Sequence, residues 1–144
     1  MKGVNAVRLK SANIEDLPLL SRWYDELRED EQADNFMIQS EIETQMKGFL
    51  QGNIYQIYLL EDSGTPLGYA MVDVTRTPYY LRHLFVRRDK RNQGIGKRLI
   101  FMLLDLLAIN GIDIEVLVWN AKAIKFYQAM GFKPRYTGMR FERL

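Results

Sequence analysis

Two glycines stand among basic residues in the segment RNQGIGKR, residues 91–98. Apolar runs lie on both sides of this segment, so it is predicted to connect a strand to a helix. A loop that leads into the N-terminus of a helix presents unpaired amide groups and the positive end of the helix dipole. Gly94 and Gly96 would let an anion approach those amides, and the basic side chains would add charge. The alternative is a tight turn in which the glycines only relieve the backbone.

Spacing separates the known kinds of phosphate-binding loop. A loop of the nucleotide-hydrolase type needs a glycine five residues before Gly96 and a Ser or Thr after Lys97. Arg91 and Arg98 occupy these two places, so that type is excluded. A dinucleotide-binding fingerprint needs a small residue at the position of Leu99, which makes this interpretation weak.

A second segment of interest is EVLVWNAKAIKFYQAMGF, residues 115–132. Its first part has the composition of a strand, Asn120 can cap the helix that follows, and Gly131 can end that helix. Tyr127 lies within the predicted helix, among apolar residues. Taken alone, a tyrosine in this environment is typical of packing at the edge of a core.

With both segments in view, the chain resembles members of the GNAT superfamily of N-acetyltransferases. The first motif is Arg-x-x-Gly-x-Gly, found at Arg91, Gly94 and Gly96. The second motif is Asn-x-x-Ala-x-x-x-Tyr-x-x-x-Gly-Phe, and its positions are Asn120, Ala123, Tyr127, Gly131 and Phe132. Either motif alone would be modest evidence, but their order, with a helix and a strand between them, is that of the family. The N-terminal third resembles the family only in its pattern of elements.

The resemblance implies acetyl-CoA as the acyl donor, as in most of the superfamily. Its pyrophosphate would rest on the backbone amides of the glycine loop, which comprises Arg91, Asn92, Gln93, Gly94, Ile95, Gly96 and Lys97. Its pantetheine arm would pair like an extra strand with the strand before the loop, at Leu84, Phe85 and Val86. This pairing requires that strand to splay away from residues 112–119. Asn120 matches a residue that often contacts the same arm in the family.

The resemblance also assigns Tyr127 as the general acid, placed near the sulfur atom of CoA. The acceptor amine must be neutral to attack a thioester, although a lysine-like amine has a pKa of about 10.4 in water. The thiol of CoA, with a pKa of roughly 8.5, leaves more readily when a proton is supplied to it.

The general base is not fixed by the motifs. Arg82 and His83 stand where many relatives carry a pair of acidic residues. His83 is one candidate, because an imidazole has a pKa of about 6.5, and the alternative is a partly buried histidine satisfied by the backbone. Glu61 and Glu115 are other carboxylates near predicted strands, and a relay of water molecules to the bulk is a further route.

The elements that would position these residues form one α/β (α+β) domain over residues 1–144. Apolar residues at helical spacing predict helices at 13–30, 40–50, 95–110 and 120–130. Runs of strand formers predict strands at 6–10, 53–61, 66–75, 79–88, 112–119 and 132–144, the second and third forming an antiparallel hairpin. The order is roughly βααβββαβαβ. The resemblance implies the GNAT fold, with a mixed, mostly antiparallel sheet flanked by about four helices.

Composition excludes several classes of site. The chain has 144 residues, a formal net charge of +2, no cysteine and one histidine. Disulfides, a cysteine nucleophile and thiolate or histidine-rich metal sites are therefore excluded, and no metal is expected. The small net charge argues against nucleic acid, and the absence of a signal-like or membrane-length apolar run predicts a cytoplasmic protein. The acidic run YDELREDEQAD, residues 24–34, is interpreted as a solvated helix face, rather than as a lining of the acceptor site.

The predicted function is transfer of an acetyl group from acetyl-CoA to a primary amine of a small molecule or peptide. The amine would attack directly within a ternary complex. The identity of the acceptor is left open, and a homodimer is considered because dimers are frequent in the family. The alternative is a regulatory domain of the same fold that binds an acyl-CoA without catalysis, since the acidic pair is missing. The retained Tyr127 favours the enzyme.

Overall fold

The computed structural model describes residues 7–144, and Ala6, the first residue of the predicted N-terminal strand, lies outside this range. The strands are β1 (Val7–Ser11), β2 (Tyr55–Asp62), β3 (Thr65–Asp73), β4 (Tyr80–Val86) and β5 (Asp113–Ile114). The α-helices are α2 (Leu17–Asp30), α3 (Gln39–Gln51), α4 (Ile95–Leu107) and α5 (Ala121–Met130). Two short 3-10 turns are η1 (Ile14–Asp16) and η2 (Arg88–Lys90).

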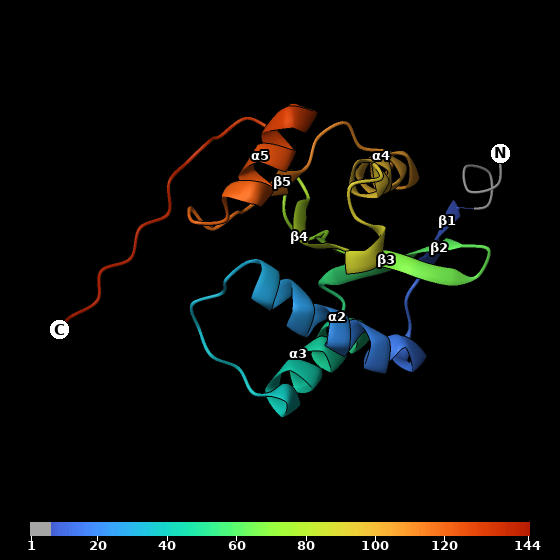
Figure 1. The fold of residues 1–144 in the computed structure, drawn as a ribbon, viewed down its shortest axis with the longest axis horizontal. Helices are drawn as coiled ribbons and strands as arrows, with labels where there is room; N and C mark the ends of the chain where they lie inside the picture. Colours follow the sequence, from blue (N-terminus) through green and yellow to red (C-terminus); the bar gives the residue numbers. More distant parts are fainter. Residues whose placement is uncertain (1–6) are drawn as a thin grey trace.

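The five strands form one sheet in the order β1-β2-β3-β4-β5. The first four strands pair antiparallel with their neighbours, and β5 pairs parallel with β4. A parallel connection between neighbouring strands needs a crossover, and α4 supplies it (Figure 1). The predicted hairpin, and the mixed, mostly antiparallel sheet with four α-helices, are therefore confirmed for the described residues. None of the helices within residues 7–144 has the length and hydropathy that crossing a bilayer requires.

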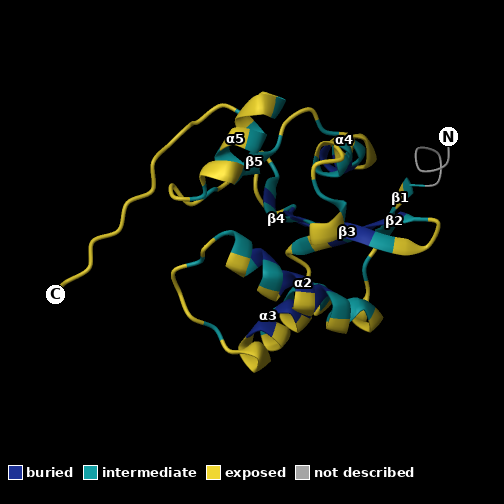
Figure 2. Cartoon of the chain, in the orientation of Figure 1, coloured by how far each residue is buried: buried dark blue, intermediate teal, exposed yellow. Residues whose placement is uncertain are grey.

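Both faces of the sheet are covered, so β3 is buried along most of its length (Figure 2). In Figure 1, α2 and α3 lie against one face of the sheet, while α4 and α5 lie on the other side. Side chains alternate along β3, and this sends Tyr69 and Met71 toward α2 and α3. Ala70 and Val72 pack instead in the core that contains α4 and α5. The domain therefore has two cores, one on each face of a shared sheet.

Local side-chain effects fix the two helix entries that matter for the site. Asn13 and Asp16 form a capping box that leads into α2. The side chain of Asn120 accepts a hydrogen bond from the Ala123 amide at 3.3 Å and so begins α5. Gly131, with φ of 106°, ends this helix in the left-handed region that favours glycine. The predicted cap at Asn120 and stop at Gly131 are confirmed.

Two predicted strands differ from the structure. The strand predicted at 112–119 is reduced to Asp113–Ile114, because its pairing with β4 ends after two residues. The strand predicted at 132–144 is wrong, since this segment has no regular structure and runs away from the body of the domain (Figure 1). A strand needs a neighbour for its backbone hydrogen bonds. No described strand pairs with this segment, and its Met139 and Phe141 side chains are exposed.

Candidate active site

β4 and β5 pair over only two residues each, and this leaves an unpaired edge. The pairs are Tyr80 with Asp113 and Leu81 with Ile114. β4 continues to Val86 and stays paired with β3 on its other side. Within residues 7–144, the backbone after Leu81 therefore has no strand partner on the side of β5. This is the splay that pairing with a pantetheine arm would require.

The three residues predicted to meet the pantetheine arm lie on this unpaired stretch. Phe85 is buried and its ring centroid lies 5.4 Å from that of Trp23 in α2. Leu84 is partly buried and packs against the core on the α4 face. The carbonyl of Val86 accepts a hydrogen bond from Nε of Arg91 at 2.8 Å, so this group is already engaged. The side chains of the stretch are thus fixed on both faces of the sheet.

β4 contains an extra residue at the start of the unpaired edge. Consecutive residues of β3 lie opposite Leu81 and His83, so Arg82 has no partner on β3. Such a β-bulge bends the strand and redirects side chains. The Arg82 guanidinium donates to the hydroxyl of Tyr55 and lies 5.0 Å from the ring centroid of Phe49. The bulge thus turns Arg82 toward aromatic side chains of β2 and α3.

The glycine segment forms the entry to α4. Asn92 and Gly94 have positive φ angles of 63° and 77°, and Gly94 is the N-cap residue. The amide of Arg98 donates to the carbonyl of Gly94 at 3.1 Å, which is the first bond of the helix. The amides of residues 95–97 precede this bond and lack acceptors within the helix. With the helix dipole, they make a place where an anion is stabilised.

Gly94 and Gly96 are needed for different reasons. At Gly94 a Cβ atom would meet nothing within 4 Å, but the φ of 77° strains any residue with a side chain. At Gly96 a Cβ atom would lie 3.1 Å from Cζ of Phe126, closer than an ordinary contact. Gly94 therefore serves the backbone turn, whereas Gly96 allows the start of α4 to approach α5.

Arg91 of the glycine loop points back to α2. Its Nη2 lies 2.7 Å from Oδ2 of Asp30, and its guanidinium carbon lies 5.1 Å from the ring centroid of Phe85. Arg88 contacts the same Asp30 at 3.0 Å and Glu26 at 3.5 Å. The sequence interpretation gave the Arg91 charge to a bound anion. In the structure this charge compensates Asp30, and the ion pair holds the glycine loop against α2.

Tyr127 lies on α5 and is partly buried. Its ring centroid is 5.0 Å from that of Phe126 and 5.2 Å from that of Phe132. Burial, and then the charges of Glu31 and Tyr80, raise the pKa of Tyr127 well above its usual range. The phenol is therefore protonated at neutral pH, which is the state that a general acid needs.

His83 is buried on the α2–α3 face of the sheet. Its Nδ1 shares a hydrogen bond with the hydroxyl of Tyr69 at 3.0 Å, and its ring centroid lies 4.6 Å from that of Tyr24. Burial, and then the positive charges of Arg82 and Arg28, lower the pKa of His83 to about 3. The imidazole is therefore neutral at physiological pH. Its partner is a tyrosine hydroxyl, whereas the alternative considered from sequence was the backbone.

Glu31 occupies a position that the sequence interpretation did not single out. It follows the last residue of α2 and is partly buried. Its amide donates to the carbonyl of Leu27 at 2.9 Å, so the helical path continues to this residue. Nε1 of Trp119, just ahead of α5, donates to the carbonyl of Gln32 at 2.9 Å. This bond holds the end of α2 near the beginning of α5 (Figure 1).

The surroundings of Glu31 disfavour its charged form. Burial, offset in part by Arg28 and reinforced by Asp30, raises the pKa of Glu31 to about 7. Burial is the main cause of the raised pKa of Tyr127, and the charge of Glu31 adds to it. Burial is also the main cause of the raised pKa of Tyr69, to which the charges of Tyr24 and Glu31 add. The carboxylate therefore lies within electrostatic range of tyrosines on both sides of the β4 edge.

The sequence did contain a signal for this position of Glu31. Leu20, Tyr24 and Leu27 are buried and lie along one face of α2. Glu31 continues that stripe, because it follows Leu27 by four residues. The interpretation of residues 24–34 as a solvated face therefore fits the exposed members of the run but not Glu31.

The other titratable groups considered from sequence lie elsewhere. Glu61 is buried on β2, where Arg8 and Lys10 of β1 approach it to 3.4 Å and 4.0 Å. Glu115 is exposed just after β5. Burial, and then Glu115, raise the pKa of Tyr80 to about 12. Among the described residues, no group of three or more His, Cys, Asp or Glu could hold a metal ion.

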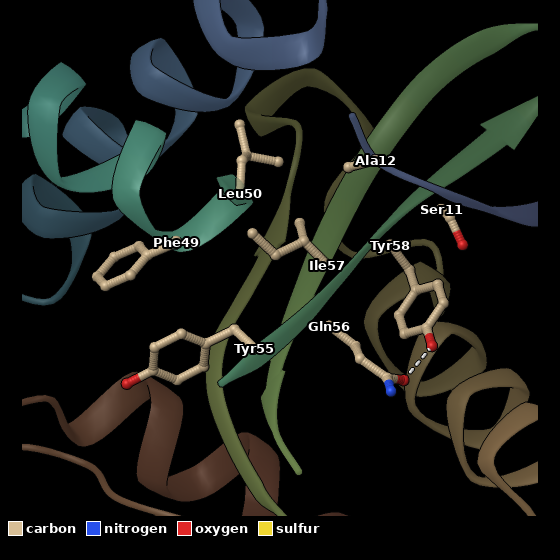
Figure 3. Close-up of a pocket in the computed structure, with 8 residues that line it drawn as sticks. All are labelled: Ser11, Ala12, Phe49, Leu50, Tyr55, Gln56, Ile57 and Tyr58. Carbon is tan, nitrogen blue, oxygen red and sulfur yellow. Dashed lines mark hydrogen bonds between the residues drawn. The ribbon is translucent and has the colours of Figure 1, made fainter. Parts of the chain in front are cut away.

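A pocket of about 360 Å³ opens between the end of α3 and the start of β2 (Figure 3). Figure 3 shows apolar side chains of both elements on one side of β2, and Tyr58 bonded to Gln56 on the other. The residues that line it are Ser11, Ala12, Phe49, Leu50, Tyr55, Gln56, Ile57 and Tyr58. None of them belongs to the glycine loop or α5, but Phe49 and Tyr55 also contact Arg82.

The unpaired β4 edge, the glycine loop and α5 fall within one continuous match to known proteins. The sequence model described as "Acetyltransferase (GNAT) family" matches residues 18–132. The chain belongs to the GNAT family. The match also includes α2 and α3, which carry the face of the GNAT domain that holds His83 and Glu31.

Curated relatives of this GNAT protein are N-acetyltransferases by name. The ribosomal protein bS18-alanine N-acetyltransferase of Escherichia coli K12 is 32% identical over 85 residues, which is 57% of this chain and 57% of that protein. The peptidyl-lysine N-acetyltransferase YjaB of Salmonella typhimurium LT2 is 36% identical over 72 residues, or 50% of this chain and 46% of that protein. The chain thus spans about half the length of the curated relatives it matches.

The GNAT fold is also found by comparison with solved structures. The aminoglycoside N-acetyltransferase AAC(6')-Iy in complex with CoA superimposes with a TM-score of 0.74 at 15% identity. The superposition covers 95% of this chain and 94% of the other. At this low identity the likeness shows the fold alone, and it extends over almost the whole length of both chains.

Proposed function

We propose that this GNAT protein is an acetyl-CoA-dependent N-acetyltransferase that acetylates a primary amine of a small molecule or peptide. The amine attacks directly within a ternary complex. The observation that carries the proposal is the unpaired edge of β4, which leads into the unpaired amides at the start of α4. A ligand with backbone-like amide groups at one end and a pyrophosphate at the other has the chemistry to satisfy both.

The residues present fit acetyl-CoA at both parts of this site. The loop from Arg91 to Lys97 is assigned to the pyrophosphate, with its amides and the positive end of α4 as the binding groups. The unpaired backbone of Leu84 and Phe85 is assigned to the pantetheine arm. Val86 contributes less than its neighbours, because Arg91 already occupies its carbonyl. Asn120 is assigned a contact with the same arm in addition to its role as a cap.

Tyr127 is the proposed general acid. Its hydroxyl stays protonated at neutral pH, because burial keeps its pKa high. The acid supplies a proton to the sulfur atom when the thioester is broken, so that a neutral thiol leaves. His83 is not favoured as the base, since its pKa is lowered to about 3 by burial and its Nδ1 is engaged by Tyr69.

The acceptor is proposed to be an amine on the basis of what the relatives are named for. One curated relative is named for an alanine of a ribosomal protein and another for a peptidyl lysine. The structural relative is named for aminoglycosides. Small molecules and peptides therefore both remain within the proposal. A cytoplasmic location and a homodimer stay predictions.

The proposal is tested by measuring thiol release from acetyl-CoA with a panel of amines. The panel comprises a peptide with a free N-terminal alanine, a lysine peptide with a blocked N-terminus, and an aminoglycoside. We expect thiol release to require both the protein and one class of amine, with one acetylated amine formed for each thiol. The dimethylated form of the successful amine is the control, because a tertiary amine cannot form a stable amide.

Two other outcomes would contradict the proposal in different ways. If acetyl-CoA raises the melting temperature but no amine gives thiol release, the chain is the non-catalytic acyl-CoA-binding domain. If acetyl-CoA neither shifts the melting temperature nor loses its acetyl group, the assignment of the β4 edge and glycine loop is wrong.

A further inference from the structure

A cationic acceptor must lose a proton before it attacks, and none of the groups considered from sequence suits that task. His83 is buried, bonded to Tyr69, and has its pKa lowered to about 3 by burial, so it is a weak base. Glu61 lies on β2, two strands away from β4, and is paired with cations of β1. Glu115 is exposed to solvent. Apart from a relay of water molecules, a base at the unpaired edge therefore has to come from another residue.

Glu31, at the end of α2, is the candidate. It continues the buried stripe of α2, and the bond from Trp119 to the next residue, Gln32, holds this end of the helix near α5. Its neighbour Asp30 is bound by Arg88 and Arg91. The Glu31 carboxylate enters no ion pair of this kind within residues 7–144. Arg28 offsets the burial of this carboxylate only in part, so Glu31 can still accept a cation from outside.

Three elements contribute the charged and titratable groups that interact with Glu31. They comprise Tyr24, Arg28 and Asp30 of α2, Tyr69 of β3, and Tyr127 of α5. The tyrosines are uncharged at neutral pH because burial raises their pKa values. Arg28 also donates to the backbone carbonyl of Asn35 in the loop after α2. Glu31 is therefore the acidic group of α2 whose charge acts on Tyr127 of α5.

We propose that the Glu31 carboxylate binds the ammonium group of the acceptor and takes its proton, while Tyr127 serves the leaving sulfur from α5. This inference rests on the proposed function, because it needs an amine acceptor and an acyl donor at the β4 edge. It adds a catalytic residue that lies outside both sequence motifs, the one in the glycine loop and the one that contains Tyr127.

The proton and bond changes balance with these two residues. Glu31 accepts one proton from the R–NH3+ group, and the freed lone pair of nitrogen attacks the thioester carbonyl carbon. The carbon–sulfur bond breaks, and Tyr127 gives its proton to the departing sulfur. The second proton lost from nitrogen restores Tyr127, and Glu31 releases its proton to solvent. The net products are the acetylated amine, the free thiol and one proton.

The ionisation of Glu31 suits this cycle near neutral pH. Burial raises its pKa to about 7, so the carboxylate is about half ionised there. A base is most effective when its pKa lies near the working pH, because it must both accept and release the proton. An unperturbed glutamate, with a pKa of 4.5, would be ionised but a weaker base.

The test is the pH dependence of kcat/KM for Glu31→Gln, measured from pH 5.5 to 9.5 with the amine found in the screen. In the wild-type protein we expect kcat/KM to rise through an apparent pKa near 7. In the variant we expect this rise to disappear and kcat/KM at pH 7.5 to fall by about 100-fold or more. The loss should shrink at pH values where the amine is already neutral, a change that a structural defect would not produce.

Asp25→Asn is the matched control, because it removes an exposed carboxylate from the same helix. It should keep the wild-type pH profile. Glu31→Asp retains an acidic group and should keep a rise with pH at reduced rate, which serves if Glu31→Gln does not fold. A rise near pH 7 that persists in Glu31→Gln, or an equal loss at every pH, would overturn the inference while leaving the proposed function intact. Absence of thiol release from the wild-type protein would instead overturn the proposed function.

Discussion

The two faces of the sheet hold their candidate functional residues by different means. On the glycine-loop side, which comprises residues 91–94, α4 and α5, the motif residues other than Tyr127 meet demands of the backbone or of helix packing. Gly94 has a positive φ, Gly96 leaves room for Phe126, and Asn120 caps a helix. On the α2–α3 side, His83 and Glu31 meet no such demand. Their chemistry comes from the residues that bury them.

The two titratable groups of the α2–α3 side are shifted in opposite directions by the same cause. Burial lowers the pKa of His83 to about 3 and raises the pKa of Glu31 to about 7. Each shift favours the neutral form, as expected where charges are poorly solvated. Near neutral pH the histidine is therefore neutral and a weak base, whereas the glutamate titrates there, as the proposed base must. The ion pairs of Asp30 with Arg88 and Arg91 join this side to the glycine loop.

The largest expected effect is on the glycine-loop side, from Tyr127→Phe. Loss of the phenolic proton should lower kcat by about 100- to 10,000-fold, the usual range for a general acid. The ring stays in place between Phe126 and Phe132, so folding and the melting-temperature shift with acetyl-CoA should be kept. Steady-state thiol release measures the effect. Tyr136→Phe, at an exposed tyrosine, is the control, and an unchanged kcat in Tyr127→Phe would remove the residue from the mechanism.

A second comparison replaces glycine by valine on each side. Gly96→Val should push against Phe126, lower the free energy of unfolding by about 1–3 kcal/mol and abolish the acetyl-CoA-induced shift in melting temperature. Gly48 lies in α3, where an added Cβ atom would meet nothing within 4 Å, and Gly48→Val should change the free energy of unfolding by less than about 0.5 kcal/mol. Denaturant unfolding with and without acetyl-CoA measures both. Equal effects at the two positions would show that close packing of α4 on α5 does not define the loop.

The same difference explains how much the sequence could predict. Glycine, asparagine and helical spacing are local signals, so the glycine loop, the α5 cap and four helices were predictable. The pairing of β4 with β5 depends on two distant segments, and the predicted strand at 112–119 therefore came out too long. The predicted last strand, at 132–144, had the composition of a strand but no neighbour to pair with.

Burial of single polar residues was the least predictable feature. His83 was considered as a base because its unperturbed pKa suits one, and only the tertiary contacts with Tyr69 and Tyr24 reveal its lowered pKa, which burial causes. Glu31 was hidden in an acidic run, although its spacing from Leu27 placed it on the buried stripe of α2. A pattern of charge describes the average of a segment, whereas a site depends on the one member that faces inward.

The opposite pKa shifts predict opposite contributions to stability between pH 4.5 and 6.5. The unfolded chain binds more protons at His83, whose pKa is lowered by burial from 6.5 to about 3, so this contribution to stability rises with pH. The folded chain binds more protons at Glu31, whose pKa is raised by burial from 4.5 to about 7, so this contribution falls as pH rises. In the wild-type protein the two slopes oppose each other.

Single variants should uncover each slope. In His83→Gln the slope of the free energy of unfolding against pH should be more negative than in the wild type, by about 1.4 kcal/mol per pH unit. Glu31→Gln should change the slope by a similar amount in the positive direction. Urea unfolding at several values between pH 4.8 and 6.2 measures these slopes. Variant slopes equal to that of the wild type would mean that the two groups titrate alike in the folded and unfolded chains.

The smallest expected effect compares one helix cap on each side. Asn13→Ala at the entry to α2 and Asn120→Ala at the start of α5 should each lower the free energy of unfolding by about 1 kcal/mol, since each removes a capping side chain. Only Asn120→Ala should also weaken acetyl-CoA binding, because only this cap is assigned a contact with the pantetheine arm. Titration calorimetry with acetyl-CoA separates the two roles. Equal affinities in both variants would reduce Asn120 to a cap and confine the pantetheine contacts to β4.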